Sequence, residues 1–453
     1  MNAPVTPQLD WSAYDSYGAG DAYAQLPSAG GGFGKAAAVC IGNRQCQREE
    51  KGVMCPSYRA TQNVQHSTHH RAATLKAALN GELGVRPFLS DALTQAMNLC
   101  VGCKGCKREC PNGTDMALLK SESLAQRWLA RGKPPLRERL LAGVPRLLPW
   151  LRRLAWLVSL RNRVPLLASL AERITGISAR RTIPAPAASS FLATQEDVVS
   201  GPEGGREVAL FVDTFSNELE PANAQAAREL LVTAGYRVHL VRAAKGERPL
   251  CCGRTWLSSG LIEAARTEAQ RVVDALWTFV ERDIPVVGLE ASCLLMLRDE
   301  YHALGLGERV PRIAKGAFLL EEFLVREHDA KRLQLCFADA AGRRVAVHGH
   351  CHQKAFGAMK AMRKLLGLVP GLQVTFIESS CCGMAGGFGF EAEHYDVSMR
   401  MAELSLLPAL RHEPAETRVI ANGMSCRHQI RDGAQRDSQH VVRLLRDALQ
   451  DVG

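Results

Sequence analysis

The feature that most constrains this chain is a run of four cysteines, Cys100, Cys103, Cys106 and Cys110, followed directly by Pro111. Two residues separate each of the first three cysteines, and three residues separate the last two. This is the bacterial iron–sulfur spacing, in which three thiolates bind one cluster and the fourth binds a second cluster in the same domain. A zinc knuckle or disulfides are the alternatives, but zinc sites favour two separated cysteine pairs. The run therefore predicts an electron carrier.

A second group of cysteines precedes this run, with one member missing. Cys40 and Cys46 have the expected separation, but Asn43 stands where the middle cysteine would be. We expect a 4Fe-4S cluster on the complete set, which is Cys55, Cys100, Cys103 and Cys106. The other cluster, on Cys40, Cys46 and Cys110, would lack a thiolate. Three outcomes stay open: a 3Fe-4S cluster, a 4Fe-4S cluster with a weak ligand such as Asn43 or water, or another cysteine brought in from elsewhere.

Helix signals surround these cysteines, and no strand signal does. One helix should be capped by Ser67 or Thr68, a second by Ser90, and a third should span residues 115–131. We therefore expect residues 37–132 to form an all-α ferredoxin domain with two cluster sites. Three histidines near the first helix are expected on its surface and not as ligands, because the cysteines already supply ligands: His66, His69 and His70.

Two segments flank this domain. Residues 1–36 are rich in Gly, Ser, Ala and Asp, and we interpret them as a flexible lead-in or a docking arm. Residues 133–200 interleave leucine with arginine, and their prolines predict a linker of short amphipathic helices.

Positive charge is concentrated in one stretch. The net charge is +10, yet residues 127–181 hold thirteen Arg and Lys against two Glu, a net +11. A basic excess confined to a connecting segment argues against a nucleic-acid protein. The basic face could lie on a membrane surface, dock an acidic partner subunit, or pack over its own domain. Its uncharged runs, such as residues 154–160, are much shorter than the about 20 apolar residues that span a bilayer.

Fifteen cysteines without a secretory signal before them indicate metal-bound thiolates in a reducing compartment. We therefore expect a cytoplasmic location. Any membrane contact would be peripheral, at the inner face of the membrane.

The second half of the chain repeats one pattern, over residues 201–342 and 343–453. Each copy has the order strand, helix, strand, helix, strand, with a Cys-Cys-Gly sequence after the second strand. Right-handed crossovers should make each sheet parallel. The predicted fold class is α plus α/β: an N-terminal all-α ferredoxin-like domain followed by a pseudo-duplicated parallel α/β domain.

The cysteines of both copies follow strands, where parallel sheets gather their sites. In the second copy, four should converge on an iron–sulfur cluster or a zinc ion: Cys351, Cys381, Cys382 and Cys426. In the first copy Thr214 aligns with Cys351, so only three thiols remain, as a weaker metal site or a structural relic. These three are Cys251, Cys252 and Cys293.

Histidines flank one of these cysteines at alternate positions. His348, His350 and His352 would share one face of an extended segment around Cys351. One of them is a candidate for contact with the metal or with a carboxylate substrate, against a hydrogen-bonded structural role.

Two arginines and a glycine-rich loop complete the candidates. Arg254 and Arg427 follow cysteine motifs and could offset thiolate charge. The loop over residues 383–389 favours close approach of its backbone to a cluster. Cys336 fits no set, and we expect it in the core.

Seven segments together carry a family resemblance: residues 52–58, 100–116, 251–254, 289–301, 350–354, 380–389 and 422–428. Through them, the chain resembles the iron–sulfur half of FAD-linked oxidases and 2-hydroxyacid dehydrogenases of the D-lactate, glycolate and D-2-hydroxyglutarate type. The Cys-Cys-Gly copies also resemble the CCG domains of heterodisulfide reductase and of the iron–sulfur subunit of anaerobic glycerol-3-phosphate dehydrogenase. The likeness runs from about residue 38 to the end.

The chain departs from the family pattern in two ways. Glu290 and Gly423 stand where the family often has a further cysteine, which puts a five-thiolate cluster in doubt. The flavin domain that usually precedes these motifs has no counterpart in the 453 residues. The resemblance therefore implies FAD on a partner, an FAD-linked oxidase subunit.

The resemblance implies an electron-transfer subunit that relays electrons from this FAD to an acceptor, either a quinone, a ferredoxin or a cytochrome. In the alternative, the CCG domain itself reduces a disulfide or a quinone at its own cluster. A structural zinc protein is the third hypothesis.

Overall fold

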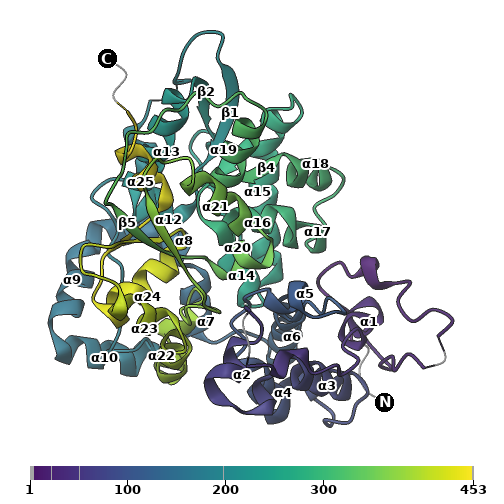
Figure 1. The fold of residues 1–453 in the computed structure, drawn as a ribbon. Coiled ribbons are helices and arrows are strands. Elements are labelled where there is room, and N and C mark those ends of the chain that lie inside the picture. Colours follow the sequence, from purple (N-terminus) through teal and green to yellow (C-terminus); the bar gives the residue numbers. More distant parts are fainter. Residues whose placement is uncertain (1–4, 22, 50–51, 197, 451–453) are drawn as a thin grey trace.

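The computed structural model describes residues 5–21, 23–49, 52–196 and 198–450. Residues 1–4, 22, 50, 51, 197 and 451–453, which include parts of the predicted lead-in, linker and second copy, lie outside the described residues. The N-terminal helices form one group at the lower right of Figure 1, and the α/β region lies above and to the left of it.

The N-terminal region is helical, and α3 and α4 begin at the predicted caps Ser67 and Ser90. The α-helices are α1 Gly31–Ala38, α2 Pro56–Thr61, α3 Thr68–Leu79, α4 Asp91–Asn98, α5 Gly105–Glu109 and α6 Met116–Arg131. Short 3-10 helices lie between them: η1 Ser12–Tyr14, η2 Gln45–Gln47, η3 Val64–His66 and η4 Pro87–Leu89. Ser67 and Ser90 accept hydrogen bonds from backbone N–H groups of the first turns of α3 and α4, and Asp115 does so for α6.

The described part of the predicted lead-in contacts the ferredoxin helices. The buried carboxylate of Glu122 in α6 accepts hydrogen bonds from the backbone N–H of Gln8 and of Leu9, each at 2.9 Å. It also accepts one from the indole N–H of Trp11 at 3.1 Å. Leu9 and Trp11 are both buried. A single carboxylate thus accepts three hydrogen bonds from this segment.

Short helices connect the N-terminal region to the α/β region, as the prolines predicted. They are α7 Leu136–Ala142, α8 Val144–Leu151, η5 Arg152–Leu154, α9 Ala155–Arg163, α10 Pro165–Thr175 and α11 Phe191–Thr194. Pro145 lies in the first turn of α8 and Pro165 begins α10, where the missing N–H costs nothing. Among the described residues, no helix is both long and apolar enough to cross a membrane.

The first parallel sheet has the strand order β2-β1-β3-β4. Its strands are β1 Arg206–Phe211, β2 Tyr236–Leu240, β3 Val286–Gly288 and β4 Ala317–Leu319. The helices around it are α12 Thr214–Glu218, α13 Pro221–Thr233, α14 Arg254–Ser258, α15 Ile262–Val280, α16 Ala291–Arg298, α17 Glu300–Ala303, α18 Arg309–Gly316 and α19 Leu320–Asp329.

The second parallel sheet has the corresponding order β6-β5-β7-β8. Its strands are β5 Arg344–His348, β6 Gln373–Ile377, β7 Arg418–Ala421 and β8 Ser438–Gln439. Its helices are α20 Cys351–Ala355, α21 Met359–Leu366, α22 Tyr395–Glu403, α23 Leu406–His412, α24 Met424–Ala434 and α25 Val441–Asp447, with the 3-10 helices η6 Phe388–Phe390 and η7 Ala392–His394. Because α13 packs on α25, the two halves share one core.

Two details differ from the sequence predictions. Each sheet has a fourth strand, β4 or β8, of three and two residues, too short to give a periodic signal. Cys336 is exposed and not in the core. In its extended segment the neighbouring Leu335 and Phe337 pack inward, so the side chain of Cys336 faces outward.

Glu122→Ala should release the lead-in. The buried N–H groups of Leu9 and Trp11 would lose their acceptor, at a cost on the order of 2–4 kcal/mol in the free energy of unfolding. Chemical denaturation measures this cost, and limited proteolysis should then cut within the first 30 residues. The control Glu82→Ala removes an exposed carboxylate and should change stability by less than about 0.5 kcal/mol. Equal losses in both variants would contradict the role of Glu122.

Candidate metal centre

The complete ferredoxin set lines one small cavity. Cys55 directly precedes α2, Cys100 follows α4, and Cys106 lies in α5. All four cysteines are buried and face this cavity: Cys55, Cys100, Cys103 and Cys106. Four convergent thiols suit a 4Fe-4S cluster, because each thiolate binds one iron. These four cysteines therefore fit the predicted 4Fe-4S cluster.

A buried arginine, Arg71, donates a hydrogen bond to one cysteine of this set. The guanidinium of Arg71 donates to Cys55 Sγ at 3.4 Å, to Ser57 Oγ at 2.8 Å and to the carbonyl of Ala96 at 2.8 Å. Burial alone would raise the pKa of the Cys55 thiol, but the charge of Arg71 and hydrogen bonds lower it below its ordinary value. Arg71 thus favours the thiolate, which is the form that binds metal.

The incomplete ferredoxin set also assembles, with Asn43 beside it. Cys40 follows α1, Cys46 lies in η2 and Cys110 directly follows α5. The side-chain amide nitrogen of Asn43 lies 3.7 Å from Cys110 Sγ and donates to Asn112 Oδ1 at 2.7 Å. Asn43 therefore presents a hydrogen-bond donor to the thiol.

The four cysteines of the second α/β half converge as predicted from their strands. Cys351 begins α20 after β5, the pair Cys381 and Cys382 follows β6, and Cys426 lies in α24 after β7. The thiol of Cys381 contacts those of Cys351 and Cys382, and Cys382 contacts Cys426. The backbone N–H of Gly383 points at Cys381 Sγ from 3.4 Å, in keeping with close backbone approach in this loop.

His348 is the histidine that joins this group. One of its ring nitrogens and the sulfurs of Cys382 and Cys426 lie within 4.8 Å of one another. Its Nδ1 bonds Ser379 Oγ at 2.8 Å, while its buried Nε2 has no hydrogen-bond partner among the described residues. Burial lowers the pKa of His348 to about 4, so the ring is neutral near pH 7.

The side chains of the other two histidines make hydrogen-bonding contacts with other parts of the protein. His350 Nδ1 accepts the backbone N–H of His352 at 3.2 Å and caps α20. His352 Nε2 lies 3.1 Å from the carbonyl of Gly102 and 2.9 Å from Arg254 Nη2, across the junction of the two regions. The sequence analysis expected His348, His350 and His352 on one face of an extended segment. Because α20 starts at Cys351, the segment is not extended throughout, and the three side chains have different surroundings.

The first α/β half gathers its three cysteines into one cluster. Cys252 contacts both Cys251 and Cys293. Thr214 begins α12 as Cys351 begins α20, and Asp213 caps α12 by accepting the backbone N–H of Phe215 at 2.9 Å. The hydroxyl of Thr214 thus stands in the first half where the thiol of Cys351 stands in the second.

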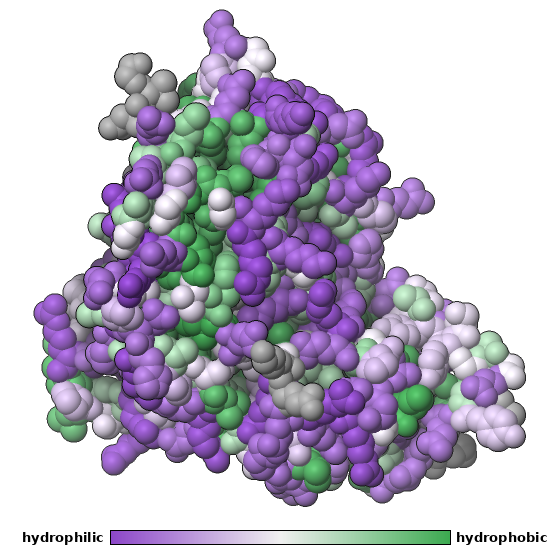
Figure 2. All heavy atoms as spheres, viewed as in Figure 1, coloured by the Kyte–Doolittle hydropathy of each residue, from purple (hydrophilic) through white to green (hydrophobic). Residues whose placement is uncertain are grey.

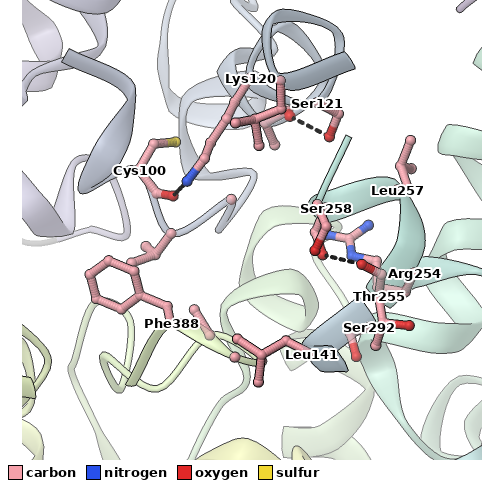
Figure 3. Close-up of a pocket in the computed structure, with 18 of the residues that line it drawn as sticks. Cys100, Lys120, Ser121, Leu141, Arg254, Thr255, Leu257, Ser258, Ser292 and Phe388 are labelled. Carbon is pink, nitrogen blue, oxygen red and sulfur yellow. Dashed lines mark hydrogen bonds between the residues drawn. The ribbon is translucent and has the colours of Figure 1, made fainter. Parts of the chain in front are cut away.

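A cavity of about 470 Å³ lies between the complete ferredoxin set and the cysteine groups of the two α/β halves. It is lined by Cys100 from the ferredoxin region and by cysteines of both α/β halves, among them Cys252, Cys293, Cys351 and Cys382. In Figure 3, Cys100 and Lys120 lie on one side, Arg254 and Ser292 lie across from them, and Phe388 closes another side. A molecule in this cavity could therefore reach two cysteine groups at once.

The ferredoxin loop and the second α/β half meet directly. Cys103, Cys351 and Cys381 pack in one buried cluster with Val53. Ser380 Oγ also donates to the carbonyl of Val53. Figure 1 shows the ferredoxin helices, with α5, next to the α/β region at α14 and α20.

A buried charge network holds the two regions together. Lys104 Nζ lies 2.8 Å from Asp115, 2.8 Å from Asp299 and 3.1 Å from Glu300. Lys104 and Asp115 belong to the ferredoxin region, whereas Asp299 and Glu300 belong to the first α/β half. Arg254 also pairs with Glu300, and this places it at the junction.

Arg427 is tied to neighbouring acceptors. It pairs with Glu220 and donates to the carbonyls of Ala421 and Asn422 at 2.7 and 2.8 Å. Its charge still acts near Cys426, because it directly follows that residue.

Comparison with known proteins agrees with this arrangement. A family model described as a 4Fe-4S dicluster domain matches residues 36–114, and one described as a cysteine-rich domain, CCG, matches residues 345–431. Lactate utilization protein A of Exiguobacterium is 30% identical over 204 residues, which cover 43% of this chain and 78% of that protein. The chain belongs to this family of CCG iron–sulfur proteins.

Other relatives of this CCG iron–sulfur protein are oxidoreductases by name. D-2-hydroxyglutarate dehydrogenase of Escherichia coli is 24% identical over 471 residues, or 94% of this chain and 45% of that protein. One subunit of the anaerobic glycerol-3-phosphate dehydrogenase of Escherichia coli is 28% identical over 284 residues, or 60% of this chain and 67% of that protein. The chain thus spans less than half the length of the first of these. An electron-transfer or oxidoreductase role follows for this iron–sulfur protein.

Lys104→Met should loosen the junction of the CCG iron–sulfur protein. It leaves three carboxylates buried without their central cation, a loss of about 3–5 kcal/mol for a buried ion pair. Thermal and chemical unfolding measure it. The control Lys107→Met removes a half-exposed lysine that contacts two of the same carboxylates, and it should cost much less. A similar loss in both variants would contradict the assigned role of Lys104.

Proposed function

We propose that this chain is the iron–sulfur electron-transfer subunit of a flavin-dependent 2-hydroxyacid dehydrogenase. It would accept electrons from FAD on a partner, an FAD-linked oxidase subunit, and pass them to a downstream quinone, ferredoxin or cytochrome. The observation that carries this proposal is the contact of Cys103 with the group of Cys351 and Cys381. The names of the relatives support the choice of substrate class.

Three of the cysteine groups are neighbours in series. Cys46 of the incomplete set neighbours Cys55 of the complete set, and Cys103 of the complete set neighbours Cys351. Clusters bound at these groups would supply one-electron redox chemistry. The chain contributes short separations, burial that excludes water, and N–H donors aimed at sulfur, such as Gly253 to Cys251 at 3.4 Å.

The proposal includes a division of the chain into domains. We assign residues 37–132 to a ferredoxin-like domain, 133–200 to the linker, and 201–342 and 343–453 to two CCG repeats related by duplication. The identical strand order of the two sheets supports the duplication. The proposed ligands are the fourteen cysteines other than the exposed Cys336.

A second function is favoured by the cavity between the cysteine groups. In this alternative, the CCG region reduces a disulfide or a quinone at the Cys351, Cys381, Cys382 and Cys426 group. The cavity of about 470 Å³ has room for such a molecule. Loss of disulfide-dependent reoxidation in Cys381→Ala would favour it, and an unchanged rate would exclude it.

The proposed relay predicts a division of labour. In the anaerobically purified chain, a 2-hydroxy acid alone should not bleach the iron–sulfur absorption, because in this proposal the FAD that accepts the hydride is on the partner. Adding the flavoprotein partner should bleach it. Cys103→Ser should slow this bleaching by at least about tenfold, since it disturbs the complete cluster. Cys336→Ser is the matched control and should leave the rate unchanged, since this thiol is exposed and outside every group. Bleaching by substrate without flavoprotein would refute the proposal.

The linker region supports a further part of the proposal, peripheral contact with an anionic membrane surface through residues 127–181. Trp150, Trp156, Leu166 and Ile174 are each more than 60% exposed, on helices that also carry arginines. Figure 2 shows hydrophobic side chains at the lower left, where α9 and α10 lie in Figure 1. Exposed tryptophan beside arginine is typical of helices that lie at a lipid interface.

Vesicle binding tests this contact. The chain should sediment with vesicles rich in anionic lipid and much less with neutral vesicles. Trp156→Glu combined with Leu166→Glu should weaken binding by about tenfold or more, since both apolar side chains would be lost. Val85→Glu, an equally exposed position in the ferredoxin region, should leave binding unchanged. Equal binding by all variants would exclude the assigned surface.

A further inference from the structure

The incomplete ferredoxin set needs a fourth donor if it is to hold four irons. Its three cysteines are Cys40, Cys46 and Cys110, and Asn43 stands at the place of the missing one. An asparagine side chain can bind iron only through its oxygen. That oxygen accepts the backbone N–H of Gln45 at 3.1 Å, and the amide nitrogen donates toward Cys110 and Asn112. Both the oxygen and the nitrogen of the Asn43 side chain therefore already make hydrogen bonds.

A neighbouring cysteine outside this set, Cys55, already has other contacts. Cys55 neighbours Cys46, but its sulfur is held by Arg71 at 3.4 Å and lies against Ser57 Oγ at the same distance. It faces the cavity of the complete set. Moving it to the incomplete set would leave the other set with three thiolates.

One of the two histidines of α3 lies beside the incomplete set. His69 is the second residue of α3, and its ring Nδ1 lies 3.8 Å from Cys40 Sγ. The backbone N–H of the same residue donates to Cys46 Sγ at 3.3 Å. One residue thus contacts two of the three cysteines, through its ring and through its backbone.

The loop that carries these cysteines is shaped around the ring. Gly42 has a φ of +84°, and a Cβ at this position would lie 3.2 Å from His69 Cε1. The loop therefore passes the imidazole closely at a glycine that combines a left-handed backbone with no side chain. From the sequence, His69 was expected only as a surface residue, because nothing in the linear spacing links position 69 to Cys40.

We propose that His69 is the fourth ligand of the cluster bound by Cys40, Cys46 and Cys110. The site then holds a 4Fe-4S cluster with three thiolates and one neutral imidazole. Histidine replaces cysteine at iron in other iron–sulfur centres and raises the reduction potential, because the bound cluster carries less negative charge. This cluster would have a higher potential than it would with a fourth cysteine. The inference rests on the proposed clusters of the ferredoxin domain, but not on the 2-hydroxyacid substrate.

Two neighbouring histidines provide the contrast. His66 Nδ1 bonds Thr61 Oγ1 at 2.8 Å, away from the incomplete set. His70 follows His69 in α3, and its backbone N–H is taken by Ser67 of the cap. Within the part of the chain that the structure describes, neither ring bonds a cysteine of that set, so His70→Ala is a matched control for His69→Ala.

The experiment is pulsed electron paramagnetic resonance on anaerobically purified protein labelled with 15N-histidine and reduced with dithionite. In the signal of the cluster bound by Cys40, Cys46 and Cys110, wild type and His70→Ala should show a strongly coupled 15N nucleus, and His69→Ala should lose it. Oxidised His69→Ala should also show a 3Fe-4S signal and contain about one iron fewer per chain. His69→Cys should restore the four-iron content without the nitrogen coupling, and its potential should be lower than that of wild type.

The outcomes separate this inference from the proposed function. If the wild-type chain contains iron but the signal of this cluster shows no strongly coupled 15N, the assignment of His69 is overturned while the electron-transfer proposal stays intact. An unchanged four-iron spectrum in His69→Ala would have the same meaning. Absence of iron from the wild-type chain would instead overturn the proposed function. The signal of the complete cluster on Cys55, Cys100, Cys103 and Cys106 reports in each variant that the domain is folded.

Discussion

The structure depends on the gathering of buried thiols where one helical loop meets the carboxyl ends of parallel strands. Cys103 of the ferredoxin loop packs against Cys351 and Cys381, which follow two different strands of the second sheet. Buried thiols in such numbers are unfavourable as thiolates unless cations, N–H donors or metal compensate the charge. The surroundings supply the first two: Arg71 at Cys55 and the backbone N–H of Gly253 and Gly383. Metal would supply the rest.

The junction that brings the loop to the strands is electrostatic. Lys104, fully buried, is surrounded by carboxylates from both regions, and Arg254 extends the network to His352. Removing one partner of such a network leaves an uncompensated buried charge, so the regions hold one relative position. This matters for function, because electron transfer between groups on separate regions requires a fixed short separation. The linker helices, by contrast, leave tryptophans and leucines on the outside of the molecule.

Much of this arrangement could be predicted from the sequence, because it follows from local rules. Ser67, Ser90 and Asp115 mark helix starts, and the position of the cysteines after strands places them at one edge of each sheet. Features that depend on contacts distant in sequence were not predicted. The lead-in is fixed by Glu122, more than 100 residues away. The ring of His69 meets Cys40 only because α3 folds back over the loop. Cys336 was wrongly expected in the core, since a lone cysteine carries no signal of its orientation.

The central claim is that these thiols hold inorganic iron and sulfide. The most direct test is to measure iron, acid-labile sulfide and zinc per chain after purification without oxygen. Iron and sulfide are expected in nearly equal amounts, enough for at least the two ferredoxin clusters, with little zinc. Zinc without iron, or protein that is colourless and free of both metals, would contradict the claim.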